Sequence, residues 1–402
     1  MSHARRTAVV AALLAIAVLP LAGCGRQDRA KGALGGASQP ALGAKGSEPK
    51  AAADLGFPGF ATKNTTRVGG ADATANAAAV ARAIYPAQTP ETRPPAVILV
   101  DGRDWHAGLV ASVLAGTPVH GAILLSDGRT LPEASRAALD ALRPTGAGPA
   151  GGAQLIRVGD VARPAGLRTT DLAGRDPFAL ARAVDAFQAA ARNTTSDRVL
   201  VVSADAPSYA MPAAAWAAKA GDPILFVGRD TLPAETAAAL RAHQQPRIYL
   251  LGPPSVVSAK VEQSLRRLGT VTRIGSGSAE QSAIDFARFT DGRFGWGIVD
   301  PGHGLVFAPT DQPLDAAAAA GLSAHGTYGP LLLLGGANTV DPPLEQFLLD
   351  IQPGYTSDPV RGVYNHGWIV GDDHALSIAA QSRIDTLLEI THVTQQKQAN
   401  SP

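Results

Sequence analysis

The sequence "RVGGADATANAAAVARAI", residues 67–84, decides the fold because similar stretches occur twice more in the chain. In each copy an apolar residue leads through glycine to a residue suited to a helix N-cap, and an alanine-rich helical pattern follows. The other two copies are "DLAGRDPFALARAV" (171–184) and "RIGSGSAEQSAIDFARF" (273–289). Taking Val68, Leu172 and Ile274 as equivalent gives spacings of 104 and 102 residues, about the size of a small domain. We therefore expect three copies of one folding unit.

The rest of each unit repeats as well. An apolar run typical of a buried strand follows each opening stretch: "AVILVD" (96–101), "RVLVVS" (198–203) and "GLVFAP" (304–309). A second strand, a polar turn and a helix opened by proline come next, in "GAILLSDGRTLPEA" (121–134), "DPILFVGRDTLPAE" (222–235) and "GPLLLLGGANTVDPPLE" (329–345). A third strand ends at Gly159, Gly252 or Gly371. Strands separated by helices predict an α/β fold with mostly parallel sheets.

Taken together, these stretches resemble the cell wall binding repeat type 2 family over residues 65–391. The resemblance implies three tandem Rossmann-like or Toprim-like modules packed with pseudo-threefold symmetry. It also implies noncovalent binding to the anionic polymers of the Gram-positive cell wall. The opening arginine and glycine of the family map to Arg67 with Gly69, to Arg168 with Gly174 and to Arg273 with Gly275. Its Asp-Ala pair is present once, as Asp315-Ala316.

The expected organisation has six parts. They are a lipoprotein signal peptide (1–23), a flexible tether (24–64), module 1 (65–166), module 2 (167–270), module 3 (271–393) and a disordered tail (394–402). Two arginines precede a short apolar run that ends in "LAGC" (21–24), which resembles a bacterial lipobox. Cys24 is the only cysteine, so we expect it to carry a lipid anchor on the outer face of the cell membrane. The alternative is a cleaved secretory signal that contains Cys24 by chance.

The charge balance limits the classes of partner. The whole chain has a formal net charge of +1, and residues 65–402 contain 27 Lys and Arg against 31 Asp and Glu. This balance gives no reason to expect nucleic acid as a partner. A polyanion would have to bind through local arginine clusters or a bridging divalent cation.

Candidate ligand residues follow the first strand of each unit, because the carboxyl ends of parallel strands and the helix N-termini form a crevice there. The carboxylates and aromatic rings suited to a sugar polymer are Asp104, Trp105, Asp205, Tyr209, Asp311 and Asp315. The arginines suited to phosphate or carboxylate are Arg67, Arg168, Arg175 and Arg273. Two structural interpretations stay open: the rings pack between units, and the arginines form salt bridges between units.

The sequence lacks the motifs of common enzyme classes. There is no P-loop, H-E-x-x-H or G-x-S-x-G, and the G-x-G-x-x-G within residues 146–152 follows no strand. His366, Asp372, Asp373 and His374 are metal-ligand types, but a polar loop explains them more simply. We therefore expect no catalytic residue, cofactor or metal, and leave the oligomeric state open. The alternatives to a wall-binding lipoprotein are a lipid-anchored solute-binding protein of a transporter and a degenerate enzyme.

Overall fold

The structure is a computed structural model that describes residues 61–325 and 329–393. The expected signal peptide, Cys24, most of the tether and the C-terminal tail lie outside the described residues. Within the described residues, no helix is long and apolar enough to cross a membrane.

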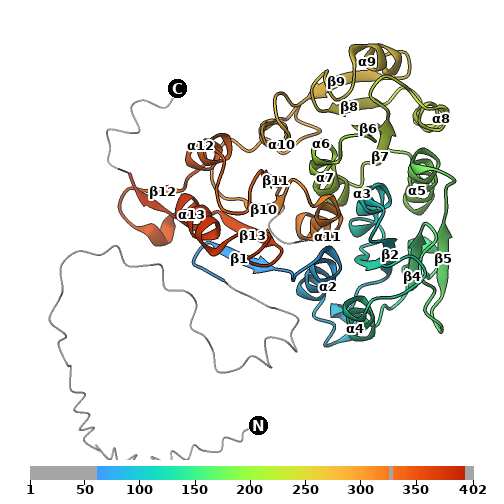
Figure 1. The fold of residues 1–402 in the computed structure, drawn as a ribbon, viewed down its shortest axis with the longest axis horizontal. Helices are drawn as coiled ribbons and strands as arrows, with labels where there is room; N and C mark the ends of the chain where they lie inside the picture. The colour runs from blue at the N-terminus through green and yellow to red at the C-terminus, as the bar shows by residue number, and fades with distance from the viewer. Residues whose placement is uncertain (1–60, 326–328, 394–402) are drawn as a thin grey trace, which may run out of the picture. The chain divides into compact units, whose positions relative to one another are not determined.

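Three four-stranded parallel sheets form the framework (Figure 1). Sheet 1 has the order β3-β2-β4-β5, with β2 (Val97–Asp101), β3 (Ala122–Ser126), β4 (Leu155–Val158) and β5 (Thr169–Leu172). Sheet 2 has the order β7-β6-β8-β9, with β6 (Arg198–Ser203), β7 (Ile224–Val227), β8 (Arg247–Leu251) and β9 (Thr270–Ile274). Sheet 3 has the order β11-β10-β13-β1, with β10 (Gly304–Pro309), β11 (Leu331–Leu334), β13 (His366–Val370) and β1 (Thr65–Val68). The same strand order recurs three times, and the expected α/β class is confirmed.

The strand that opens each repeat belongs to the sheet of the neighbouring repeat. Leu172 of β5 pairs with Val158 of sheet 1, and Ile274 of β9 pairs with Leu251 of sheet 2. Val68 of β1 pairs with Val370 of sheet 3, so the first described strand completes the last sheet. The sheets are therefore offset by one strand from the sequence repeats, and the two ends of the described chain are joined through sheet 3.

The helix after each opening strand packs on the next sheet. The three helices are α2 (Ala73–Ile84), α5 (Pro177–Arg192) and α10 (Ala279–Arg288), which contact β3, β7 and β11 respectively. Their N-caps are the ones that the sequence indicates: Asp72, Asp176 and Ser278 each accept a hydrogen bond from the backbone amide three residues on. The helices after the second strands are α4 (Glu133–Leu142), α8 (Ala234–Ala242) and α12 (Pro342–Asp350).

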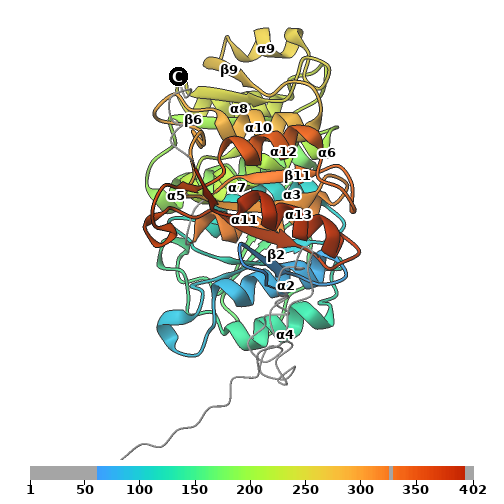
Figure 2. The same cartoon turned by 90° about the vertical axis from the view of Figure 1, so that its left-hand side faces the viewer.

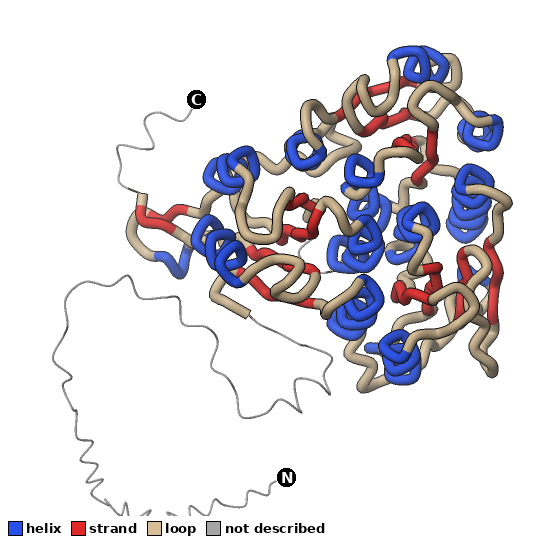
Figure 3. Tube along the Cα trace, in the orientation of Figure 1, coloured by secondary structure: helices blue, strands red, loops and turns tan. Residues whose placement is uncertain are grey.

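Three alanine-rich helices occupy the space between the sheets (Figure 3). They are α3 (Trp105–Ala111), α7 (Pro212–Ala220) and α11 (Pro313–Ala324), one from each repeat. Helix α11 packs against both others, and most of their residues are buried. Small side chains suit this position because they let helix backbones approach closely. This contact of three equivalent helices is what pseudo-threefold packing requires.

The connection after the third strand differs between modules. Helix α9 (Ala259–Leu265) lies in this connection in module 2, and α13 (Ile378–Leu388) follows the third strand in module 3. In module 1 residues 159–168 contain no helix. Module 3 also has a parallel pair of short strands, β12 (Gly354–Tyr355) and β14 (Thr391–His392). Figure 2 views the molecule from the side of sheet 3, where α12 and α13 face the viewer. The short helix α6 (Pro207–Ala210) precedes α7.

Candidate functional site

Two of the candidate arginines, Arg67 and Arg273, form hydrogen bonds to the loop that follows the third strand of the sheet to which they belong. Arg67 is 6% exposed and donates to the carbonyl of Gly371 at 3.1 Å and to that of Leu376 at 2.6 Å. Burial lowers the pKa of Arg67 more than the nearby carboxylates of module 3 raise it. Arg273 donates in the same way to Gly252 at 2.8 Å and also pairs with Glu262. Both guanidinium groups thus stabilise the loop after the third strand and face little solvent.

The equivalent position at the start of module 2, on strand β5 of sheet 1, is Asp171, and the mapping of the family arginine to Arg168 is wrong. The strand register aligns Leu172 with Val68 and Ile274, so the residue before it is equivalent to Arg67. Arg157 of the adjacent strand β4 supplies the guanidinium instead: it donates to Ala162 at 2.9 Å and to Asp171 at 2.8 Å. Arg168 precedes β5, at the amino edge of sheet 1, and is exposed.

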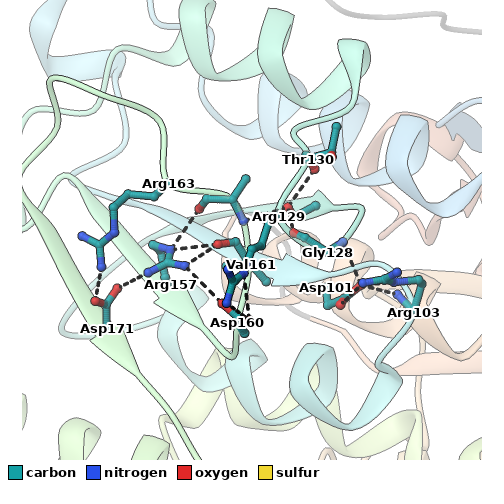
Figure 4. A network of polar contacts seen from close by, with 12 residues as sticks. Asp101, Arg103, Gly128, Arg129, Thr130, Arg157, Asp160, Val161, Arg163 and Asp171 are labelled. Carbon is teal, nitrogen blue, oxygen red and sulfur yellow. Dashed lines mark hydrogen bonds and ion pairs between the residues drawn. The ribbon is translucent and has the colours of Figure 1, made fainter.

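The carboxyl edge of sheet 1 carries a network of arginines and aspartates (Figure 4). Arg103 binds Asp101 through two nitrogens at 2.9 and 3.0 Å, and Arg129 binds Asp160 at 2.7 Å. Arg163 joins Arg157 on Asp171. Each guanidinium therefore has a carboxylate partner, and an incoming anion would have to displace it.

The network keeps its carboxylates ionised. The hydrogen bond from the Arg103 side chain is the main cause that lowers the pKa of Asp101, and partial burial opposes it. The hydrogen bond from Arg129 lowers the pKa of Asp160 in the same way. Arg129, Arg157 and Asp160 are not among the residues that the sequence pattern indicates. A usable signal was present, because Arg129 and Asp160 follow the second and third strands directly, where side chains reach the same edge.

The two aromatic candidates pack between repeats. The ring of Trp105 lies 5.7 Å from that of Phe226 in module 2, in an edge-to-face arrangement, and stacks on His106 at 3.8 Å. The hydroxyl of Tyr209 donates to the carbonyl of Gly277 in module 3 at 3.0 Å. Both rings are partly exposed, and both contact a residue of a neighbouring repeat. These contacts agree with the structural interpretation of the aromatic residues.

The carboxylate candidates divide into a helix cap, two exposed groups and one buried group. Asp104 caps α3 by accepting from His106 and Ala107; burial raises its pKa, but these bonds outweigh burial and the net shift is downward. Asp205 and Asp311 are exposed. Asp315 is 1% exposed and accepts from Asn76 of module 1 at 2.8 Å, and burial raises its pKa to about 6.

Arg175 is exposed at the start of module 2. Its guanidinium pairs with Asp176 at 3.3 Å and with Glu235 at 3.0 Å. Arg182 also pairs with Glu235. These contacts stay within module 2, so they do not form the salt bridges between repeats that the sequence left open.

The clefts at the carboxyl edges contain more carboxylates than cations. A cleft of about 460 Å³ beside sheet 1 is lined by Arg103 with Asp72, Asp127 and Glu133. A second cleft, of about 280 Å³ beside sheet 3, is lined by Asp72, Asp315, Asp372 and His374. Such linings are unfavourable for a polyanion unless a cation intervenes.

One cluster has the donor types of a metal site. Ligand atoms of Asp372, Asp373 and His374 lie within 4.8 Å of one another in the loop after β13. Asp372 also accepts hydrogen bonds from the amides of His374 and Ala375, which is an ordinary turn arrangement. The geometry therefore agrees with the polar loop that the sequence favours.

Comparison with known proteins supports the resemblance. Residues 172–262 match the family model Cell wall binding domain 2 (CWB2). Two similar solved structures are Cwp8 from Clostridium difficile, with a TM-score of 0.62 and 18% identity, and Cwp6 from Clostridium difficile, with a TM-score of 0.63 and 16% identity. The matches cover 81% and 82% of this chain but 52% and 48% of those chains, so this chain spans about half their length. No curated protein sequence matches the chain.

The comparisons confirm the expected family resemblance over the matched segment, and the structural likeness confirms the fold. The family match supports a protein associated with the cell wall.

Proposed function

We propose that the chain binds noncovalently to an anionic polymer of the cell wall through its three modules. The proposal starts from the match of residues 172–262 to a cell wall binding domain 2. The observation that carries the proposal is the threefold recurrence of one strand order around three packed central helices, of which the matched segment is one repeat. Each repeat offers its own carboxyl edge, built on the same strand order, to a repeating polymer. Several weak contacts on one chain then act together and raise the overall affinity.

The proposal includes no catalysis. At the carboxyl edge of sheet 1 the arginines pair with aspartates, and the site contains no nucleophile placed beside a general base. Among the candidate residues, Arg168, Arg175, Asp205 and Asp311 are exposed and stay candidates for polymer contact. The side chains of Arg67, Arg273 and Asp315 form hydrogen bonds inside the folded protein and face little solvent.

Sedimentation with isolated walls tests the proposal. The full chain carrying Cys24→Ser, which removes the proposed lipid site, is mixed with walls that retain their anionic polymers and with walls stripped of them. We expect most of the protein to pellet with the first walls and to stay in solution with the second. Equal pelleting with both would assign the binding to peptidoglycan, and no pelleting with either would refute wall binding.

We also propose that a lipid on Cys24 anchors the chain to the outer face of the cell membrane. The support is the "LAGC" sequence before the only cysteine. Membrane fractionation compares the parent with Cys24→Ser, and mass measurement of the N-terminal peptide identifies the modification. A parent that fractionates as Cys24→Ser does, with an unmodified thiol, would contradict the anchor.

A further inference from the structure

The amino edge of sheet 1 carries a basic cleft that differs from the edges described above. The cleft has a volume of about 430 Å³ and lies among residues that precede β2, β4 and β5. Arg93 and Arg143 line it, together with Gln154 and one carboxylate, Asp140. Pro164, Ala165 and Leu167 of the connection that lacks a helix in module 1 form one wall.

Neither guanidinium in this cleft forms a close ion pair. In residues 61–325 and 329–393, no carboxylate lies within 4.0 Å of a nitrogen of Arg93 or Arg143. The exposed carboxylate of Glu91 interacts with Arg93 only at longer range. This contrasts with Arg103, Arg129 and Arg157 at the opposite edge, which all have carboxylate partners. An anion can therefore bind at the amino edge without displacing a protein group.

Arg93 has a buried donor without an acceptor. Its Nε atom is among the few buried side-chain polar atoms of the described residues that have no hydrogen-bond partner, and it is the only one of them on a charged side chain. A buried donor left unpaired costs free energy, and an acceptor in the cleft that reached it after a small shift of the side chain would recover that cost. One guanidinium nitrogen of Arg143 donates a hydrogen bond to the carbonyl of Ala87 at 3.0 Å, which fixes the guanidinium in place.

We propose that this cleft binds an oxyanion, a phosphate or a carboxylate, between Arg93 and Arg143. Guanidinium groups match both anions because they present parallel donors to paired oxygens. The carboxyl end of α4 and the carboxylate of Asp140 both repel an anion. The helix end amounts to only about half a negative charge, so the two groups together do not outweigh the positive charges of Arg93 and Arg143. The backbone amide of Arg168 donates to the side chain of Gln154 at 3.2 Å and so holds one lining residue in place, while the Arg168 guanidinium lies over Gly146 and Gly152. That the anion belongs to a wall polymer rests on the proposed function.

Phosphate titration tests the site itself. The thermal midpoint of the full chain carrying Cys24→Ser is measured against inorganic phosphate at constant ionic strength, alone and with Arg93→Gln, Arg143→Gln or Arg129→Gln. The last is the matched control, because Arg129 is an exposed arginine paired with Asp160. We expect saturable stabilisation, weakened about tenfold in apparent affinity by Arg93→Gln and by Arg143→Gln but not by Arg129→Gln. An absent response, or an equal loss in the control, would overturn the proposal.

A stability measurement separates binding from a structural role. Without phosphate, Arg93→Gln should leave the thermal midpoint unchanged or raise it, because no native hydrogen bond of that side chain is lost. A fall of several degrees would assign Arg93 to the fold and overturn the proposal.

Two polymers identify the source of the anion. Poly(glycerol phosphate) and polygalacturonate are tested as competitors of phosphate; competition by either supports the site and names its chemistry, and competition by neither contradicts a role in polymer binding. Wall sedimentation of the Arg93→Gln/Arg143→Gln variant then separates the two proposals. If that variant pellets as the parent does, the role of this cleft in wall binding is refuted while wall binding stands, whereas a parent that does not pellet refutes wall binding itself.

Discussion

Asp315 is a buried carboxyl group in helix α11, where it accepts a hydrogen bond from Asn76 of helix α2. The equivalent residues of the other two modules, Ala107 and Met211, carry no charge. The Asn76–Asp315 pair is therefore particular to the junction between the first and last modules. Burial raises the pKa of Asp315 to about 6, and Asp311 and Asp72 add to the shift.

This shift predicts how stability depends on pH. Between roughly pH 4 and pH 6 the folded chain binds a proton that the unfolded chain releases, so the contribution of Asp315 to stability falls as pH rises through this window. At pH 7 the ionised group costs up to about 3 kcal/mol. Asp315→Asn keeps an acceptor for Asn76 and removes the charge. We expect urea unfolding to show a gain of about 1–3 kcal/mol at pH 7 and a much smaller gain at pH 4.5.

The exposed residue Asp230, which is not among the groups that shift the pKa of Asp315, provides the control, since Asp230→Asn should change stability by less than about 0.5 kcal/mol at either pH. A loss of stability in Asp315→Asn at pH 7 would contradict the raised pKa.

At this scale the sequence predicted helix caps well and ligand residues less well. Asp72, Asp176 and Ser278 cap helices because a cap depends on residues three positions away. The role of Arg67 depends on carbonyls more than 300 residues away, which no local pattern reveals. In sheet 1 the guanidinium comes from Arg157 of strand β4 and not from the edge strand β5, so Arg168 does not occupy the position of Arg67 and Arg273.

The elements exchange one strand between successive repeats. The sequence predicted the strands themselves, because apolar runs between polar turns are a local signal. It did not predict that β5, β9 and β1 join the sheet of the neighbouring repeat, because the choice of partner strand depends on long-range packing.

This exchange predicts which sheet loses stability when an opening strand is weakened. Ile274 of β9 is 4% exposed and pairs with Leu251 of β8. Ile274→Ala should cost about 2–4 kcal/mol and speed amide hydrogen exchange in β8 of sheet 2 more than in β11 of sheet 3. Leu172→Ala, the equivalent change in β5, should act on sheet 1. Faster exchange confined to sheet 3 after Ile274→Ala would show that β9 does not pair within sheet 2.

The three repeats act as one body because their central helices approach closely. At Gly116, after the first central helix, a side-chain carbon would lie 1.7 Å from the carbonyl oxygen of Ala218 in α7. The backbones of modules 1 and 2 would have to separate to admit it. Close approach of whole modules is a property that the repeat pattern predicts only in outline.

Gly116→Ala should therefore destabilise the body by roughly 2 kcal/mol or more. Gly148→Ala is the matched control, because nothing lies within 4 Å of the added carbon. Urea unfolding measures both variants. A Gly116→Ala variant as stable as the parent would mean that modules 1 and 2 do not meet in this way.

The salt dependence of polymer binding tests the central claim most directly. The full chain carrying Cys24→Ser is titrated with purified anionic wall polymer at increasing sodium chloride concentration, and the dissociation constant is measured at each step. Binding by arginines to a polyanion predicts saturable association that weakens steadily as salt rises, because ions screen exposed charges beyond about 10 Å at 0.1 M. Absent binding at low salt, or an affinity that salt leaves unchanged, would contradict the account.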